Sequence, residues 1–261
     1  MNILVVLRNL YGNPDPFEDE LLVGDSDVNA ISEACEIRDL LLEGKGAKVT
    51  CLLFSESQSQ SEKALIKAAS YGADEVCHIP IDDFDFTDAN TFSKVIAGII
   101  REHFPGDLVI FGRLAYDGDS VNISTQVAEN LGYSRGIYSK KVEKLSQSLV
   151  FRKALETGDE ALVEVPLPAV LHTIRKEGLR RQAKIADIIR AHNEVTVQRL
   201  SQETGKQAAK IAMEGAWAGT WKEEVPPYQE ATDMVVLNGI SDIETAQNLI
   251  DTLKAMGFEP K

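Results

Sequence analysis

The residue types with the most evident chemistry lie in residues 111–120, where two glycines, two aspartates and a serine follow a short apolar run. Gly112 and Gly118 let the backbone turn tightly and approach a ligand closely. Asp119 or Ser120 can cap a helix that begins there, and the first backbone N–H groups of that helix can hold an anion such as phosphate. An ordinary capped turn between a strand and a helix fits these residue types equally well.

No catalytic set accompanies this segment. Asp117 and Asp119 suit general acid–base chemistry, but they suit helix capping and hydroxyl recognition equally well. The sequence has no G-x-S-x-G, H-E-x-x-H or C-x-x-C motif, and its four histidines show no metal-ligand spacing. We therefore expect a chain that binds a nucleotide, has no catalytic or metal site of its own, and is not an enzyme when alone.

Composition narrows the class of protein further. Asp and Glu outnumber Lys and Arg by 41 to 27, which gives a formal net charge of −14 and disfavours nucleic acid as a partner. Cys35, Cys51 and Cys77 lie in apolar patterns and are expected to be reduced core residues. The sequence shows no signal peptide and no run long enough for membrane insertion. A cytoplasmic protein is expected.

Apolar runs alternate with helical patterns through the first half of the chain. Strands are expected at residues 2–7, 48–54, 75–79 and 107–111, and helices at 28–43, 62–71, 89–103 and 120–131. This alternation predicts an α/β fold with a doubly wound, mostly parallel, Rossmann-like sheet. Ligands bind such sheets outside the carboxyl ends of the strands, so the loops after the first, second and fourth strands should meet there. The G-x-G-x-x-G and G-x-x-x-x-G-K-[ST] fingerprints are absent.

The pattern changes after Gly132. Alternating residues predict a small antiparallel β extension at about residues 137–166, another strand of the main sheet at 169–174, and a helix at 183–192. Residues 195–228 are expected to be irregular.

The chain should end in an amphipathic helix at residues 242–256, whose apolar stripe could contact a partner or pack on its own domain. We divide the chain into a nucleotide-binding domain, residues 1–192, and an extended C-terminal arm with its helix, residues 193–261. The arm is expected to contact an alpha subunit or a dehydrogenase.

The order of motifs resembles the beta (small) subunit family of electron-transfer flavoproteins over nearly the whole length. The most specific segment is Gly-Arg-Leu-Ala-Tyr-Asp-Gly-Asp-Ser at residues 112–120, followed by Asn122 and Ala-Glu-Asn-Leu-Gly at 128–132. Tyr-Gly-Ala-Asp at residues 71–74 and Ile-Ile-Arg-Ala at 188–191 match further family motifs. The chain resembles a divergent member in this respect: of the family's N-P-x-D before the first helix, only Asp27 remains.

The resemblance implies a heterodimer with a FAD-bearing electron-transfer flavoprotein alpha subunit, serving an acyl-CoA or other dehydrogenase. The site of this chain would hold AMP, or FAD in a member that performs electron bifurcation. Carried over by position, the nucleotide would contact Val6, Gly24, Asp27, Phe54, Ala115, Asp117, Gly118, Asp119, Ser120, Val121, Asn122 and Ile123.

A different class of function fits the same fold. A stand-alone adenine-nucleotide-binding sensor or regulatory protein would need no redox partner, and fold analogy does not separate it from an electron carrier. A lyase or ligase that uses an adenylate is the third hypothesis, and the missing catalytic set disfavours it.

Overall fold

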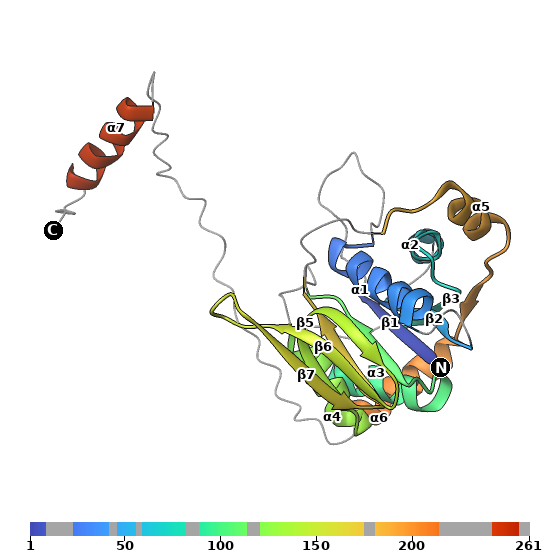
Figure 1. Cartoon of the computed structure of the whole chain (residues 1–261). Helices are drawn as coiled ribbons and strands as arrows, with labels where there is room; N and C mark the ends of the chain where they lie inside the picture. The colour runs from blue at the N-terminus through green and yellow to red at the C-terminus, as the bar shows by residue number, and fades with distance from the viewer. Residues whose placement is uncertain are drawn as a thin grey trace. The chain divides into compact units, whose positions relative to one another are not determined.

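The computed structural model describes residues 1–8, 23–41, 46–55, 59–81, 89–113, 121–174, 181–213 and 242–255. The chain forms two units, Met1–Ala216 and Trp217–Lys261. The first unit is an α/β domain (Figure 1), and the described part of the second is helix α7 (Asp242–Ala255). The expected domain boundary after residue 192 does not coincide with this division. None of the helices in the described residues is long and apolar enough to cross a membrane.

One nine-stranded sheet organises the first unit, with the strand order β7-β6-β5-β8-β4-β1-β2-β3-β9. Its strands are β1 (Asn2–Arg8), β2 (Lys48–Ser55), β3 (Glu75–Pro80), β4 (Leu108–Phe111), β5 (Ser134–Leu145), β6 (Ser148–Ala154), β7 (Glu160–Pro166), β8 (Ala169–Thr173) and β9 (Val197–Arg199). The strands from β5 through β8 and β4 to β9 pair in parallel. This confirms the mostly parallel α/β sheet predicted from the sequence.

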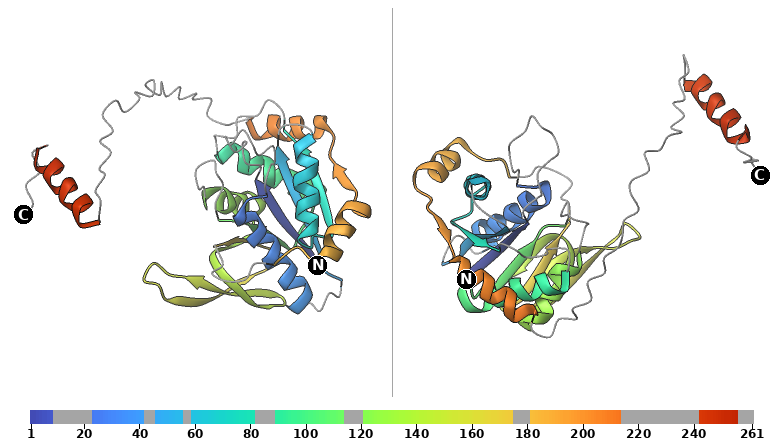
Figure 2. Two further views of the ribbon diagram at one scale, coloured as in Figure 1. Left: turned by 90° about the horizontal axis from the view of Figure 1, so that it is seen from above. Right: turned by 180° about the vertical axis from the view of Figure 1, so that it is seen from behind.

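Helices cover both faces of the sheet (Figure 2). On one face, α1 (Asp25–Glu36), α2 (Ser59–Ser70) and α5 (Ile185–Asn193) contribute to a core that includes Ile31, Leu65 and Ala191. On the other face lie α3 (Ala89–His103), α4 (Val121–Leu131) and α6 (Gln202–Met213), whose core includes Ile96 and Val127. Because the central strands are buried on both faces, they are nearly continuous apolar runs, as parallel strands require.

The antiparallel extension is confirmed, and it continues the main sheet. Strand β5 pairs in parallel with β8 and then, after β-bulges, antiparallel with β6, which pairs with β7. The buried Glu33 of α1 accepts a hydrogen bond of 2.7 Å from the Val142 N–H at one of these irregularities. The bulge interrupts the hydrogen bonds between the strands, and the Glu33 carboxylate accepts from the N–H that is left over. This charge-assisted hydrogen bond connects the extension to α1.

The expectation of irregular structure throughout residues 195–228 was wrong. Strand β9 adds a short parallel edge to β3, and α6 follows it directly. Helix α6 approaches the sheet closely at Gly205, where a Cβ atom would lie 2.1 Å from the Pro80 carbonyl oxygen. Helix α1 also begins earlier than predicted, at Asp25, and continues into the π-helical segment η1 (Ile37–Leu41).

Candidate functional site

The chain order reverses beside β1. From β1 the chain proceeds to β2 and β3 on one side, and then crosses to β4 on the other side. Helices α1 and α4, which follow β1 and β4, lie on opposite faces of the sheet. Both begin at the carboxyl edge of these strands, so their positive N-terminal ends flank the position where open α/β sheets bind ligands.

Gly112 joins the two sides of this switch point. It follows β4 directly, and a Cβ atom at this position would lie 2.4 Å from the Ser26 carbonyl oxygen and 3.0 Å from the Asp27 backbone nitrogen. Only glycine lets the chain after β4 lie against the first turn of α1. Helix α1 begins at this contact, where the Val28 N–H donates a 3.0 Å hydrogen bond to the Gly24 carbonyl.

The structure describes seven of the twelve residues that the resemblance assigns to the nucleotide. Val6 and Phe54 lie at the ends of β1 and β2, and both side chains are buried in the core of the α3/α4 face. Phe54 packs edge-to-face on Phe92 of α3, with ring centroids 6.1 Å apart. These two residues therefore offer mainly backbone at the carboxyl edge of the sheet.

The other described residues belong to the starts of α1 and α4. Gly24 precedes α1, and Asp27 lies buried in its first turn. Val121, Asn122 and Ile123 form the first turn of α4, where Asn122 is exposed and Ile123 is buried. Ala115, Asp117, Gly118, Asp119 and Ser120 lie outside the described residues, so their assignment stays a prediction.

The buried polar face of α1 was missed by sequence reasoning. Asn29 lies three residues after Ser26 on the same side of the helix, and both are buried. The Asn29 Oδ1 atom has no hydrogen-bond partner within the structure described. The signal was available in the sequence, since residues 25–33 hold six polar or charged positions in a helix that covers the sheet.

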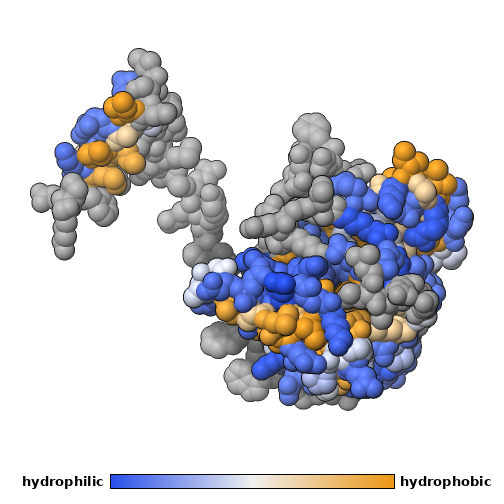
Figure 3. Space-filling view, viewed as in Figure 1, coloured by the Kyte–Doolittle hydropathy of each residue, from blue (hydrophilic) through white to orange (hydrophobic). Residues whose placement is uncertain are grey.

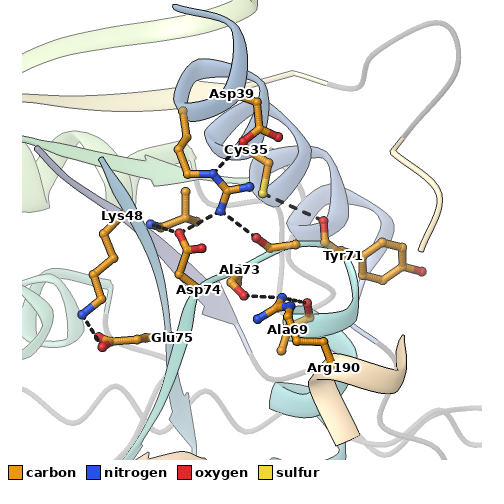
Figure 4. Close-up of polar contacts among 12 residues, drawn as sticks. Cys35, Asp39, Lys48, Ala69, Tyr71, Ala73, Asp74, Glu75 and Arg190 are labelled. Atoms are coloured by element: carbon orange, nitrogen blue, oxygen red, sulfur yellow. Dashed lines mark hydrogen bonds and ion pairs between the residues drawn. The ribbon is translucent and has the colours of Figure 1, made fainter. Parts of the chain in front are cut away.

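Charged hydrogen bonds fix the opposite end of α1 (Figure 4). The Arg38 guanidinium donates to the Gly72 carbonyl at 2.9 Å and to Asp74 at 2.7 Å, and it pairs with Asp39 at 2.7 Å. Arg181 also donates to Asp39, at 2.9 Å. Burial alone would raise the pKa of Asp39, but the hydrogen bonds from the two arginines outweigh it and lower that pKa. Arg38 thus holds the 71–74 turn directly, and Arg181 reinforces this arrangement through Asp39.

Helix α5 presents apolar residues to solvent beside this turn. Arg190 donates hydrogen bonds of 3.0 Å to the carbonyls of Ala69 and Ala73, which fixes α5 against the end of α2. On the outer side, Ile185 is 78% exposed, and Ile188 and Ile189 are also exposed. The patch is visible over α5 in Figure 3. The i, i+3, i+4 spacing of these three isoleucines is visible in the sequence and could have revealed the patch. The structure adds that Ala191 is the buried residue of this helix, so the isoleucines face outward.

These features define an open, mostly parallel α/β fold whose chain order reverses between β1 and β4. The comparisons with known proteins specify it further. Residues 18–203 match the Electron transfer flavoprotein domain family, and the chain belongs to that family, as a member of its beta-subunit branch.

Three relatives illustrate the match. The electron transfer flavoprotein subunit beta of Thermoanaerobacterium thermosaccharolyticum is 29% identical, with 98% of each chain covered. The subunit of the same name from Clostridium acetobutylicum is 30% identical over 83% of this chain and 85% of the relative. The caffeyl-CoA reductase-Etf complex subunit CarD of Acetobacterium woodii is 23% identical over 89% of this chain and 86% of its own. These relatives support a role in electron transfer beside a partner subunit.

Proposed function

We propose that this chain binds AMP or FAD in the crevice between β1 and β4, and carries electrons as the beta subunit of a heterodimer with a FAD-bearing alpha subunit. The single observation that carries the proposal is the approach of Gly112 to Ser26. It places the first turn of α1 against the chain leaving β4, at the edge where α4 also begins. The family assignment supplies the electron-transfer role.

The groups around the crevice fit an adenine nucleotide. The N-terminal end of α4 is suited to a phosphate group, and the exposed Asn122 in its first turn can donate to a phosphate oxygen. Asp27 is suited to the hydroxyl groups of a ribose, since its carboxylate would repel a phosphate. The buried Asn29 Oδ1, two residues after Asp27 in α1, is a further hydrogen-bond acceptor. When bound, a flavin supplies the redox chemistry, whereas this chain supplies placement and electrostatics.

Two apolar surfaces support association with partners. One is the outer side of α5, and the other is the stripe on α7, where Ile243, Ile250 and Leu253 are exposed on the helix considered by itself. Apolar side chains gathered on one helix side commonly mark a protein contact. We propose that α7 binds the alpha subunit and that α5 meets a dehydrogenase. Electron bifurcation is part of the proposal only if the crevice holds FAD.

The proposal is tested by the nucleotide content of the heterodimer. The chain would be co-expressed with its alpha subunit, the complex denatured, and the released FAD and AMP counted per heterodimer. Two FAD would support bifurcation, and one FAD with one AMP would support a simple carrier. A complex that releases one FAD and no second nucleotide would contradict the proposed site. If no complex forms and the lone chain retains a nucleotide, the protein is a stand-alone nucleotide-binding protein.

The role of α7 is tested in the same preparation. A variant that ends at residue 241 should lose association with the alpha subunit while its thermal unfolding stays unchanged. A heterodimer of unchanged affinity would exclude α7 from the interface.

A further inference from the structure

Tyr138 is held in a backbone conformation that tyrosine rarely adopts. Its φ angle is +59°, and among the described residues no other non-glycine residue has a positive φ. For a bulky side chain this left-handed conformation is costly and persists only where the surroundings impose it. Here they do, because the pairing of β5 with β8 is shifted between Gly136 and Ser139, and Tyr138 lies within that shift.

The tyrosine ring rests on a buried histidine. Tyr138 and His172 meet edge-to-face, with ring centroids 5.7 Å apart and an interplanar angle of 86°. His172 is buried near the end of β8, whereas Tyr138 is 37% exposed. A tyrosine that served only the core would be covered like its partner. The histidine therefore acts as a support, and the tyrosine ring is presented at the surface.

This pair lies on the carboxyl edge of the sheet, beside the proposed crevice. His172 pairs directly with Phe111 of β4, the last residue before Gly112. Val170, two residues earlier in β8, belongs to the core under α3 and α4, so His172 points to the same face. Helix α4 begins on that face. Tyr138 belongs to β5, the strand next to β8 along this edge.

The strand order gives the direction in which a long ligand would run. Phe54, Val6 and the start of α4 follow one another across β2, β1 and β4, and the next strands in the same direction are β8 and β5. Tyr138 lies two strand spacings beyond β4, about 10 Å. A mononucleotide whose phosphate sits at α4 ends before that position. The ribityl chain and isoalloxazine ring of FAD would reach it.

We propose that Tyr138, supported by His172, contacts the flavin half of a bound FAD and does not contact AMP. The proposal rests on the proposed nucleotide site and makes Tyr138 a specificity-determining residue within it. An aromatic ring favours a flat heterocycle by stacking, an interaction that every planar ring system can make.

The test compares the affinities of the full-length chain for AMP and for FAD by titration calorimetry. Tyr138→Asn removes the ring, while asparagine tolerates a positive φ better than most residues, so the backbone is preserved. Tyr138→Phe keeps the ring, and Leu162→Ala, at a 69% exposed residue of β7, serves as a control. We expect Tyr138→Asn to weaken FAD binding about tenfold and to leave AMP binding unchanged. Tyr138→Phe and Leu162→Ala should bind both as the wild type does.

Flavin fluorescence gives a second readout, since a tyrosine stacked on the isoalloxazine quenches its emission. Because this quenching is electron transfer from the phenol, bound FAD should be brighter in both Tyr138→Asn and Tyr138→Phe than in the wild type, although only Tyr138→Asn weakens binding. Unchanged FAD affinity and emission in Tyr138→Asn would overturn the inference, and so would an equal loss of AMP and FAD binding. A wild-type chain that binds AMP but not FAD would overturn it and leave the nucleotide site intact. A chain that binds neither would overturn the inference, and the nucleotide content of the heterodimer would then decide the proposed site separately.

Discussion

Gly112 lies so close to Ser26 that a Cβ atom on the glycine would be 2.4 Å from the serine carbonyl oxygen. This contact joins the chain leaving β4 to the first turn of α1, two segments far apart in the sequence. Both partners are backbone, so neither can give way by a change of side-chain rotamer. The separation between the end of β4 and the first turn of α1 is therefore set by the absence of one side chain.

Gly112→Ala should force these two segments apart. We expect a loss of about 1–3 kcal/mol in the free energy of unfolding, the usual cost of overpacking, together with weaker retention of a nucleotide. Denaturant unfolding and the nucleotide content of the purified protein measure the two effects. Gly98→Ala in α3 is the matched control, because a Cβ atom there meets nothing within 4 Å. Equal behaviour of the two variants would contradict the close approach at Gly112.

Asp39 should contribute to the acid sensitivity of the fold. Its pKa is lowered in the folded state by Arg38 and Arg181, despite partial burial. The stabilisation is therefore full above the unfolded-state pKa of about 3.9 and is lost as the pH falls through the lower folded-state value. The Asp39→Asn variant should lack this pH dependence. The difference in the free energy of unfolding should be less than about 1 kcal/mol, because the carboxylate is partly exposed. Urea midpoints at pH 7 and below pH 4 measure it, with Glu156→Gln in the exposed turn after β6 as the control.

The three cysteines should be inert in the native protein. Burial raises the pKa of Cys35 and of Cys77 to about 11, and raises that of Cys51 well above its usual range. Because the thiolate is the reactive form, a disulfide reagent at pH 8 should modify none of them rapidly. In denaturant all three should react. An exposed thiol introduced by Glu156→Cys shows that the reagent is active, and rapid loss of a native cysteine would contradict the burial.

The outer side of α5 should affect partner exchange more than stability. Ile185→Ser replaces a side chain that is 78% exposed, so the free energy of unfolding should change by less than about 0.5 kcal/mol. If α5 meets the dehydrogenase, the rate of electron exchange with it should fall about tenfold, as for a central apolar contact. Association with the alpha subunit should be unaffected. Leu162→Ser on β7 controls for exposed apolar residues in general, and an equal effect of both variants would remove the special role of α5.

Much of the fold is predictable from local patterns. The apolar run ending at Phe111 and the helical spacing from Ala89 to His103 each fit one kind of element, and β6 and β7 lie within the extension predicted at residues 137–166. The ordered motifs at residues 71–74, 112–120 and 188–191 point to the family on their own. Such patterns are legible because burial of one face imposes a period of two or 3.6 on the side chains.

Other features depend on contacts between distant residues. Strand β9 has three residues, too few to show a period, and it is a strand only because β3 offers it an unpaired edge. Helix α6 follows β9 and lies against Pro80 through its own Gly205, where a Cβ atom would be 2.1 Å from the Pro80 carbonyl oxygen.

The sequence by itself determined the family, the alternation of strands and helices, and the edge of the sheet where a ligand should bind. Only the tertiary structure decided which groups line that edge: Gly112 against Ser26, the buried Asn29, and Tyr138 presented by His172. Local propensity acts within a few residues. These relationships depend instead on strand order and register, which are established only when the whole sheet has formed.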